Sequence, residues 1–112
     1  FLRRPHLISG RAEESKANFA YQRNSIRQQV EESFARLDVA NKSITTTSRE
    51  VLASRESLRL ARLRFKAGIT NQREVVNSQR DLTQAELRYA NSINSYNTNL
   101  AQLHFQRFLD SY

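Results

Sequence analysis

The chain has 112 residues, of which 38% are hydrophobic and 26% charged, and it contains two glycines, one proline and no cysteine. Because turns depend on glycine and proline, this composition allows few turns, which argues against β-sandwiches, barrels and glycine-loop nucleotide folds. The lack of cysteine excludes disulfides and thiolate metal or redox sites. The net charge of +7 raises nucleic acid, anionic lipid and an acidic protein surface as possible partners without choosing among them.

The first part of the chain predicts a short irregular segment followed by a very long helix. Pro5 and Gly10 both lie within residues 1–10, which we expect to form an irregular lead-in. Residues 11–66 contain neither glycine nor proline. This segment predicts one helix about 84 Å long.

A turn and a second helix follow. Residues 67–70 form the expected hairpin tip, in which Gly68 is suited to the left-handed conformation that ends a helix. Residues 71–109 again lack glycine and proline and predict a returning helix. Asn71 with Glu74 three residues later fits an N-terminal cap of that helix.

Large apolar residues recur every seven positions along both predicted helices. In the first helix they are Val30, Leu37, Ile44, Val51, Leu58 and Phe65; in the second they are Val75, Leu82, Tyr89, Tyr96 and Leu103. Three positions further on, each helix carries small residues, among them Ala61 and Ala85. The columns mirror each other about the turn, so that Leu58 is expected level with Leu82. The sequence therefore predicts an all-α fold, a long antiparallel coiled-coil hairpin with these residues in its seam.

Other apolar residues lie off this seam. On the first helix they are Phe34, Val39, Leu52, Ala53, Leu60 and Leu63; on the second they are Leu87, Ile93, Leu100 and Phe108. A two-helix hairpin has one seam, so these additional faces predict further helices as neighbours. The first helix also outruns the second, which leaves residues 11–28 without a partner inside the chain.

No pattern in the sequence predicts catalysis, a cofactor or a metal site. His6 and His104 are far apart, and neither has a second metal ligand three or four residues away. Phosphate-binding glycine loops and nucleophile motifs are also missing. We therefore expect no enzymatic activity.

Positive charge gathers around the turn. The segment from Arg55 to Glu74 holds six basic residues against two acidic ones: Arg55, Arg59, Arg62, Arg64, Lys66 and Arg73 against Glu56 and Glu74. This cluster is either a solvated cap favoured by the helix dipole, a docking tip for a protein, or a nucleic-acid patch. Nucleic-acid binding favours aromatic residues interleaved with basic ones, and only Phe65 lies nearby, so a docking tip is the better of the two functional interpretations.

The turn also carries a motif. Residues 64–70 read Arg-Phe-Lys-Ala-Gly-Ile-Thr, and residues 75–79 read Val-Val-Asn-Ser-Gln. Residues 54–61 precede this motif and residues 85–90 follow it. In this order and spacing, residues 11–110 resemble the helical hairpin of TolC-type outer-membrane efflux channels. Of the two hairpin repeats in a full-length member of that family, the chain looks most like the C-terminal one.

The resemblance implies a homotrimer in which each full chain supplies two hairpins to a twelve-helix periplasmic α-barrel, of which this chain would be a fragment. The hairpin tips of that family meet a periplasmic adaptor protein, and the resemblance implies neither a cofactor nor nucleic acid. By position, Gly68, Ile69, Thr70 and Asn71 match the tip loop of the family, and Phe65 matches the aromatic residue before it. The predicted partner-binding tip consists of these five residues together with Arg62, Arg64 and Arg73. Some relatives place a gating arginine two residues after the glycine; here Thr70 stands there, so Arg64 or Arg73 would have to substitute.

Two other interpretations stay open. The tip pattern of periplasmic adaptor proteins is nearly met by Arg59, Leu63 and Thr70, so the chain could be the hairpin of the adaptor itself. A basic coiled coil that serves as a general interaction module, including one that binds nucleic acid, is the other alternative.

Overall fold

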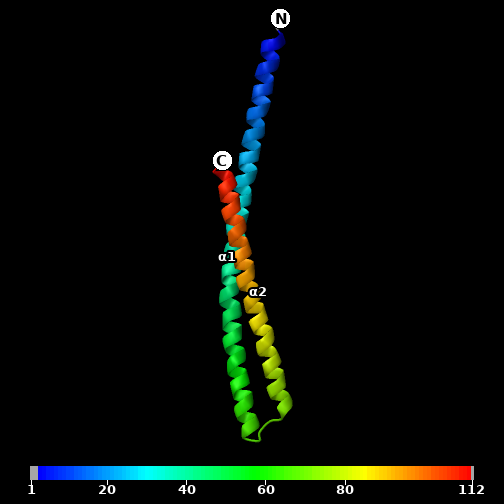
Figure 1. The fold of residues 1–112 in the computed structure, drawn as a ribbon, viewed down its shortest axis with the longest axis vertical. Helices are drawn as coiled ribbons and strands as arrows, with labels where there is room; N and C mark the ends of the chain where they lie inside the picture. The colour runs from blue at the N-terminus through cyan, green and yellow to red at the C-terminus, as the bar shows by residue number, and fades with distance from the viewer. Residues whose placement is uncertain (1–2, 112) are drawn as a thin grey trace.

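The computed structural model describes the backbone of residues 3–111 and the side chains from Gly10 to Ser111. Two long antiparallel helices are joined by one tight turn (Figure 1). Helix α1 spans Arg3–Lys66 and helix α2 spans Gln72–Asp110, within overall dimensions of 100 × 19 × 14 Å. The predicted all-α helical hairpin is confirmed.

The N-terminal start of α1 corrects the expected irregular lead-in. The helix begins at Arg3 rather than at Arg11, and residues 1 and 2 lie outside the described part of the chain. Pro5 falls in the first turn, where backbone N–H groups have no partner inside the helix, so its missing N–H costs no hydrogen bond. Gly10 lies inside the helix, where it costs only about 1 kcal/mol relative to alanine and does not break it.

The seam between α1 and α2 contains the heptad column. All of its residues from Val30 to Leu58 on α1, and from Val75 to Leu103 on α2, are buried or half-buried. Phe65, at the tip end of the column, is 46% exposed.

The closest packing occurs at small residues. Ala85 has no exposed surface, and Ser33 and Ala61 are 1% and 2% exposed. A small side chain at the centre of a helix–helix contact lets the two helix axes approach closely. Larger residues pack on both sides of this line; the apolar cluster consists of Val51, Leu58, Leu82 and Ala85, with Val75 and Tyr89 packed against it.

Hydroxyl groups inside the seam have hydrogen-bond partners. Ser43 and Ser92 bond to each other across the helices at 3.0 Å, and Ser33 donates to the side-chain oxygen of Gln106. Thr47 donates to the backbone oxygen of Ser43 at 2.8 Å. Among the residues that the structure describes, no buried side-chain nitrogen or oxygen lacks a partner. These hydrogen bonds make polar residues tolerable in the seam, because a buried polar group without a partner would cost about 1–3 kcal/mol.

The two flanks of the seam differ in charge. On one flank, which we call the paired flank, Arg64 meets Glu74 at 3.2 Å and Arg88 meets Glu50 at 3.1 Å. Each exposed pair contributes at most about 1 kcal/mol. The opposite charges nevertheless neutralise this side of the hairpin toward the tip.

Candidate functional site at the hairpin tip

The turn that ends α1 is a Schellman motif. Gly68 adopts a positive φ of 73°, which side-chain-bearing residues rarely adopt. The N–H of Ile69 donates to the oxygen of Arg64 at 2.9 Å, and the N–H of Gly68 donates to the oxygen of Phe65 at 3.0 Å. These bonds satisfy the last carbonyl groups of α1 and fix the direction in which the chain leaves the helix.

Glu74 joins the two ends of the turn. Its backbone N–H donates to Oδ1 of Asn71 at 3.2 Å, which caps α2. Its carboxylate accepts one hydrogen bond from Arg64 on α1 and another from the hydroxyl of Thr70. Arg64, one candidate substitute for the gating arginine, is therefore paired inside its own hairpin, whereas Arg73 has no ion pair among the described residues.

The surface of the tip combines apolar and basic groups. Ile69 is 69% exposed, Leu63 49% and Phe65 46%. Of the residues that the sequence predicts for partner binding, the exposed ones are Arg62, Arg64, Phe65, Gly68, Ile69, Asn71 and Arg73. Thr70 is half-buried. The tip therefore exposes both apolar side chains and cations, and its role in partner binding stays a prediction.

Gly68→Ala is expected to lower the free energy of unfolding by about 1 kcal/mol, because an alanine pays the steric cost of the left-handed conformation. A Cβ at Gly68 meets nothing within 4 Å, so this cost comes from the backbone alone. Gly10→Ala is the matched control, since its Cβ also enters open space but the site is helical. Urea unfolding should show a lower midpoint for Gly68→Ala and an unchanged or higher one for Gly10→Ala. Equal midpoints would show that φ at Gly68 is not constrained.

A second feature lies on the face of α1 near the tip, and we call it the cationic groove. It encloses about 380 Å³ and is lined by Arg55, Leu58, Arg59, Arg62, Leu63, Lys66 and Leu82. The four cations are spaced by four, three and four residues, which places them in one row on a helix. The net charge of the segment does not distinguish these four cations from the other basic residues near the turn. Their spacing distinguishes them, because it places them on one face of the helix.

One cation of the row is paired. Nε and Nη2 of Arg59 donate to the carboxylate of Glu56 at 2.9 and 2.6 Å. These hydrogen bonds, with a smaller coulombic contribution from the same guanidinium, hold the pKa of Glu56 below its ordinary value despite an opposing effect of desolvation. Among the described residues Arg55, Arg62 and Lys66 have no ion pair.

The pair predicts a small pH effect. Because the pKa of Glu56 is lowered in the folded chain, its contribution to stability is present above the unfolded-state pKa and is lost as the pH falls through the folded-state pKa. An NMR titration of the Glu56 carboxyl carbon should give a midpoint below that of an unpaired glutamate. Arg59→Gln should move the midpoint upward, and Arg55→Gln, which leaves the pair intact, should move it much less. A midpoint that Arg59→Gln does not move would contradict the pair.

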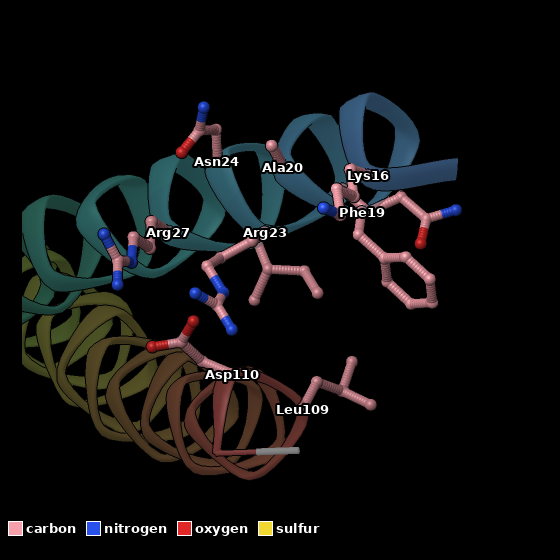
Figure 2. Close-up of a pocket in the computed structure, with 10 residues that line it drawn as sticks. Lys16, Phe19, Ala20, Arg23, Asn24, Arg27, Leu109 and Asp110 are labelled. Atoms are coloured by element: carbon pink, nitrogen blue, oxygen red, sulfur yellow. The ribbon is translucent and has the colours of Figure 1, made fainter. Parts of the chain in front are cut away.

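A third feature is an open groove where α2 ends against α1. It encloses about 750 Å³; α1 contributes Lys16, Phe19, Ala20, Gln22, Arg23, Asn24, Ile26 and Arg27, and α2 contributes Leu109 and Asp110. Figure 2 shows that the side chain of Asp110 on α2 points toward α1 and that the side chain of Arg23 on α1 points toward α2. Residues 10–24 of α1, some of which line this groove, are all exposed. Apart from the groove it shares with Leu109 and Asp110, this overhang has no neighbouring helix within the described chain.

The remaining candidates give no site. His104 is exposed, and the side chain of His6 lies outside the described ones. In the part of the chain that the structure describes, no three histidine or acidic side chains are grouped closely enough to hold a metal ion. Neither helix has a described stretch that is long and apolar enough to cross a membrane.

Comparison with known proteins identifies the family. The family model described as outer membrane efflux protein matches residues 9–105, which includes the turn, the seam and most of both helices. No curated protein and no solved structure matches the chain. The match agrees with the resemblance that the motif at the turn indicates. The chain therefore belongs to the outer membrane efflux protein family.

Proposed function

We propose that this chain is a hairpin of the periplasmic α-barrel of a trimeric outer-membrane efflux channel. In this role it performs no chemistry. It forms part of the wall of a passive export duct, and its tip docks a periplasmic adaptor protein. The family is one of efflux proteins and not of enzymes, which agrees with a wall element rather than a catalyst.

The observation that supports this proposal best is the apolar surface outside the seam. Leu52 on α1 and Leu87 on α2 are 63% and 61% exposed, at the same level of the hairpin. Also exposed off the seam are Phe34, Val39, Ala53, Leu60, Leu63 and Phe108, whereas Ile93 and Leu100 are half-buried. Apolar side chains on the outer sides of both helices favour a neighbour on each side, as in the wall of a closed barrel. The overhang of α1 would pack against a helix from the other half of the full-length channel.

Tip docking can be tested by cysteine cross-linking, because the chain has no cysteine of its own. Ile69→Cys introduces a thiol at a position that is 69% exposed on the turn. In cells that express the full-length channel, we expect a short bifunctional thiol reagent to link Ile69→Cys to cysteines at the hairpin tip of the adaptor. Tyr21→Cys, at a side chain that is 76% exposed in the overhang, is the matched control and should not be linked to the adaptor tip.

Two outcomes would count against the proposal. Equal cross-linking at both positions would indicate nonspecific proximity. Linkage of Ile69→Cys to a channel protein other than a second copy of its own parent chain would favour the alternative that the hairpin belongs to the adaptor.

A further inference from the structure

We propose that the cationic groove binds a helix of a partner protein that carries carboxylates at intervals of four, three and four residues. The inference rests on the proposed docking function of the tip and specifies the chemistry of the partner. Nothing in a general docking role requires a charged row on one face of α1. The row is a property of this chain.

The four cations of the row are spread along the helix axis, so they suit an extended helical ligand better than a single anion. Arg55, Arg59, Arg62 and Lys66 extend over eleven residues of α1, a length of about 16 Å. Residues with this spacing lie on one face of a helix, and the same spacing places four carboxylates on one face of a partner helix. Two such helices can therefore lie side by side with each cation next to an acid.

The charge of the groove is not neutralised within the hairpin. On the paired flank, Arg64 and Arg88 each have an acidic partner on the other helix. In the groove the only ion pair among the described residues is Arg59 with Glu56 on the same helix, and both are more than half exposed. The hairpin thus has one neutral flank and one cationic flank near the tip, and the cationic flank is the one that attracts an acidic partner.

The floor of the groove is apolar. Leu58 and Leu82 are 5% and 8% exposed and close the groove from below, whereas Leu63 is 49% exposed at its side. Cations around apolar side chains complement an amphipathic helix whose apolar residues are flanked by carboxylates. Because Leu63 contributes apolar contact area, the groove can bind more than counter-ions.

The occupant is not a second copy of this hairpin and not a nucleic acid. A second copy brings the same six basic residues against two acidic ones to its own tip, and no stretch of the chain has acidic residues at the spacing of the row. Nucleic-acid surfaces combine cations with aromatic stacking platforms, whereas the side chains between these cations are leucines. An acidic helix from a different protein satisfies both the charge and the apolar floor.

The test uses a synthetic peptide as the probe. It is a fluorescently labelled alanine-rich helix with leucines on one face and four glutamates at the spacing of the row; a second peptide distributes the same glutamates around the helix. Binding to the chain is followed by fluorescence anisotropy at about 0.15 M salt, where exposed charges more than about 8 Å apart are largely screened. The groove variant Arg55→Gln/Arg62→Gln/Lys66→Gln should weaken binding of the first peptide about tenfold, from a few-fold loss per exposed ion pair.

The matched control is Arg11→Gln/Arg27→Gln/Arg49→Gln. It removes the same charge from exposed positions outside the groove and should weaken binding by less than about twofold, because distant charges are screened. All six positions are exposed, so circular dichroism should show unchanged helicity. If the groove variant loses helicity, Arg62→Gln alone is used and should still weaken binding more than Arg49→Gln.

Several results would overturn the inference. These are absence of peptide binding, equal weakening by both triple variants, equal binding of both peptides, and tighter binding of duplex DNA with the same dependence on the groove. Failure here is distinguishable from failure of the docking function. If Ile69→Cys links to the adaptor while the peptide does not bind, the tip docks without using the groove. If the peptide binds while the cross-link is missing, the groove recognises acidic helices but the docking proposal is wrong.

Discussion

Leu58→Ala is expected to lower the free energy of unfolding of the hairpin by about 2–3 kcal/mol. Leu58 is 5% exposed and belongs to the apolar cluster with Val51, Leu82 and Ala85. Truncation removes buried apolar surface and leaves a cavity between two long helices. The value lies near the lower end of the usual range for leucine, because a seam with solvent on both sides can partly collapse around the missing side chain. Urea unfolding followed by circular dichroism measures the change.

Leu52→Ala is the matched control for this substitution. Leu52 lies on the same helix and is 63% exposed, so the same truncation removes little buried surface. Its effect should stay within about 0.5 kcal/mol. If both substitutions had the same effect, Leu58 would not be part of the core. If Leu52→Ala were costly only in the assembled channel, Leu52 would contact a neighbouring helix there, as the proposed barrel requires.

The seam could be predicted from the sequence because two independent regularities agree there. The seven-residue period selects one face of each helix, and the mirror relation about the turn selects which residues lie level. The burial of Leu58 and Leu82 follows from both. The turn was predictable for a similar reason, since Gly68 and Asn71 each have a conformational role that few other residues can take.

The N-terminal start and the groove were not predicted, for different physical reasons. Proline breaks a helix in its interior but is tolerated in the first turn, where Pro5 lies. Glycine inside a helix lowers its stability without ending it, and Gly10 is such a residue. The groove depends on which flank of the seam each charge occupies. In an antiparallel pair, charges on one flank meet their counterparts on the same flank of the other helix, and the pairing of Arg64 with Glu74 and Arg88 with Glu50 leaves Arg55 and Arg62 on the opposite flank. Assigning charges to flanks before counting them would have found the row.

Ala85→Leu should destabilise the hairpin by about 1–3 kcal/mol, although it adds apolar surface. Ala85 has no exposed surface and lies in the column of small residues at the centre of the helix–helix contact. A leucine there must either push the helices apart or adopt a strained rotamer. Ala90→Leu, at an exposed position on the same helix, makes the same chemical change without crowding and should stay within about 0.5 kcal/mol.

The two variants together separate close packing from hydrophobicity. If burial of apolar area alone stabilised the hairpin, Ala85→Leu would raise the unfolding midpoint in urea, and the small column would have no role in setting the helix separation. If helix separation decides, Ala85→Leu lowers the midpoint. Ala85→Gly adds no side-chain volume and should cost about 1–2 kcal/mol, from the lower helix propensity of glycine and the loss of one buried methyl group. If the hairpin is part of a barrel wall, Ala85→Leu should also affect the assembled channel. Helices pushed apart at Ala85 change the width of one wall element, so Ala85→Leu should reduce export by the full-length channel even at temperatures where the hairpin stays folded.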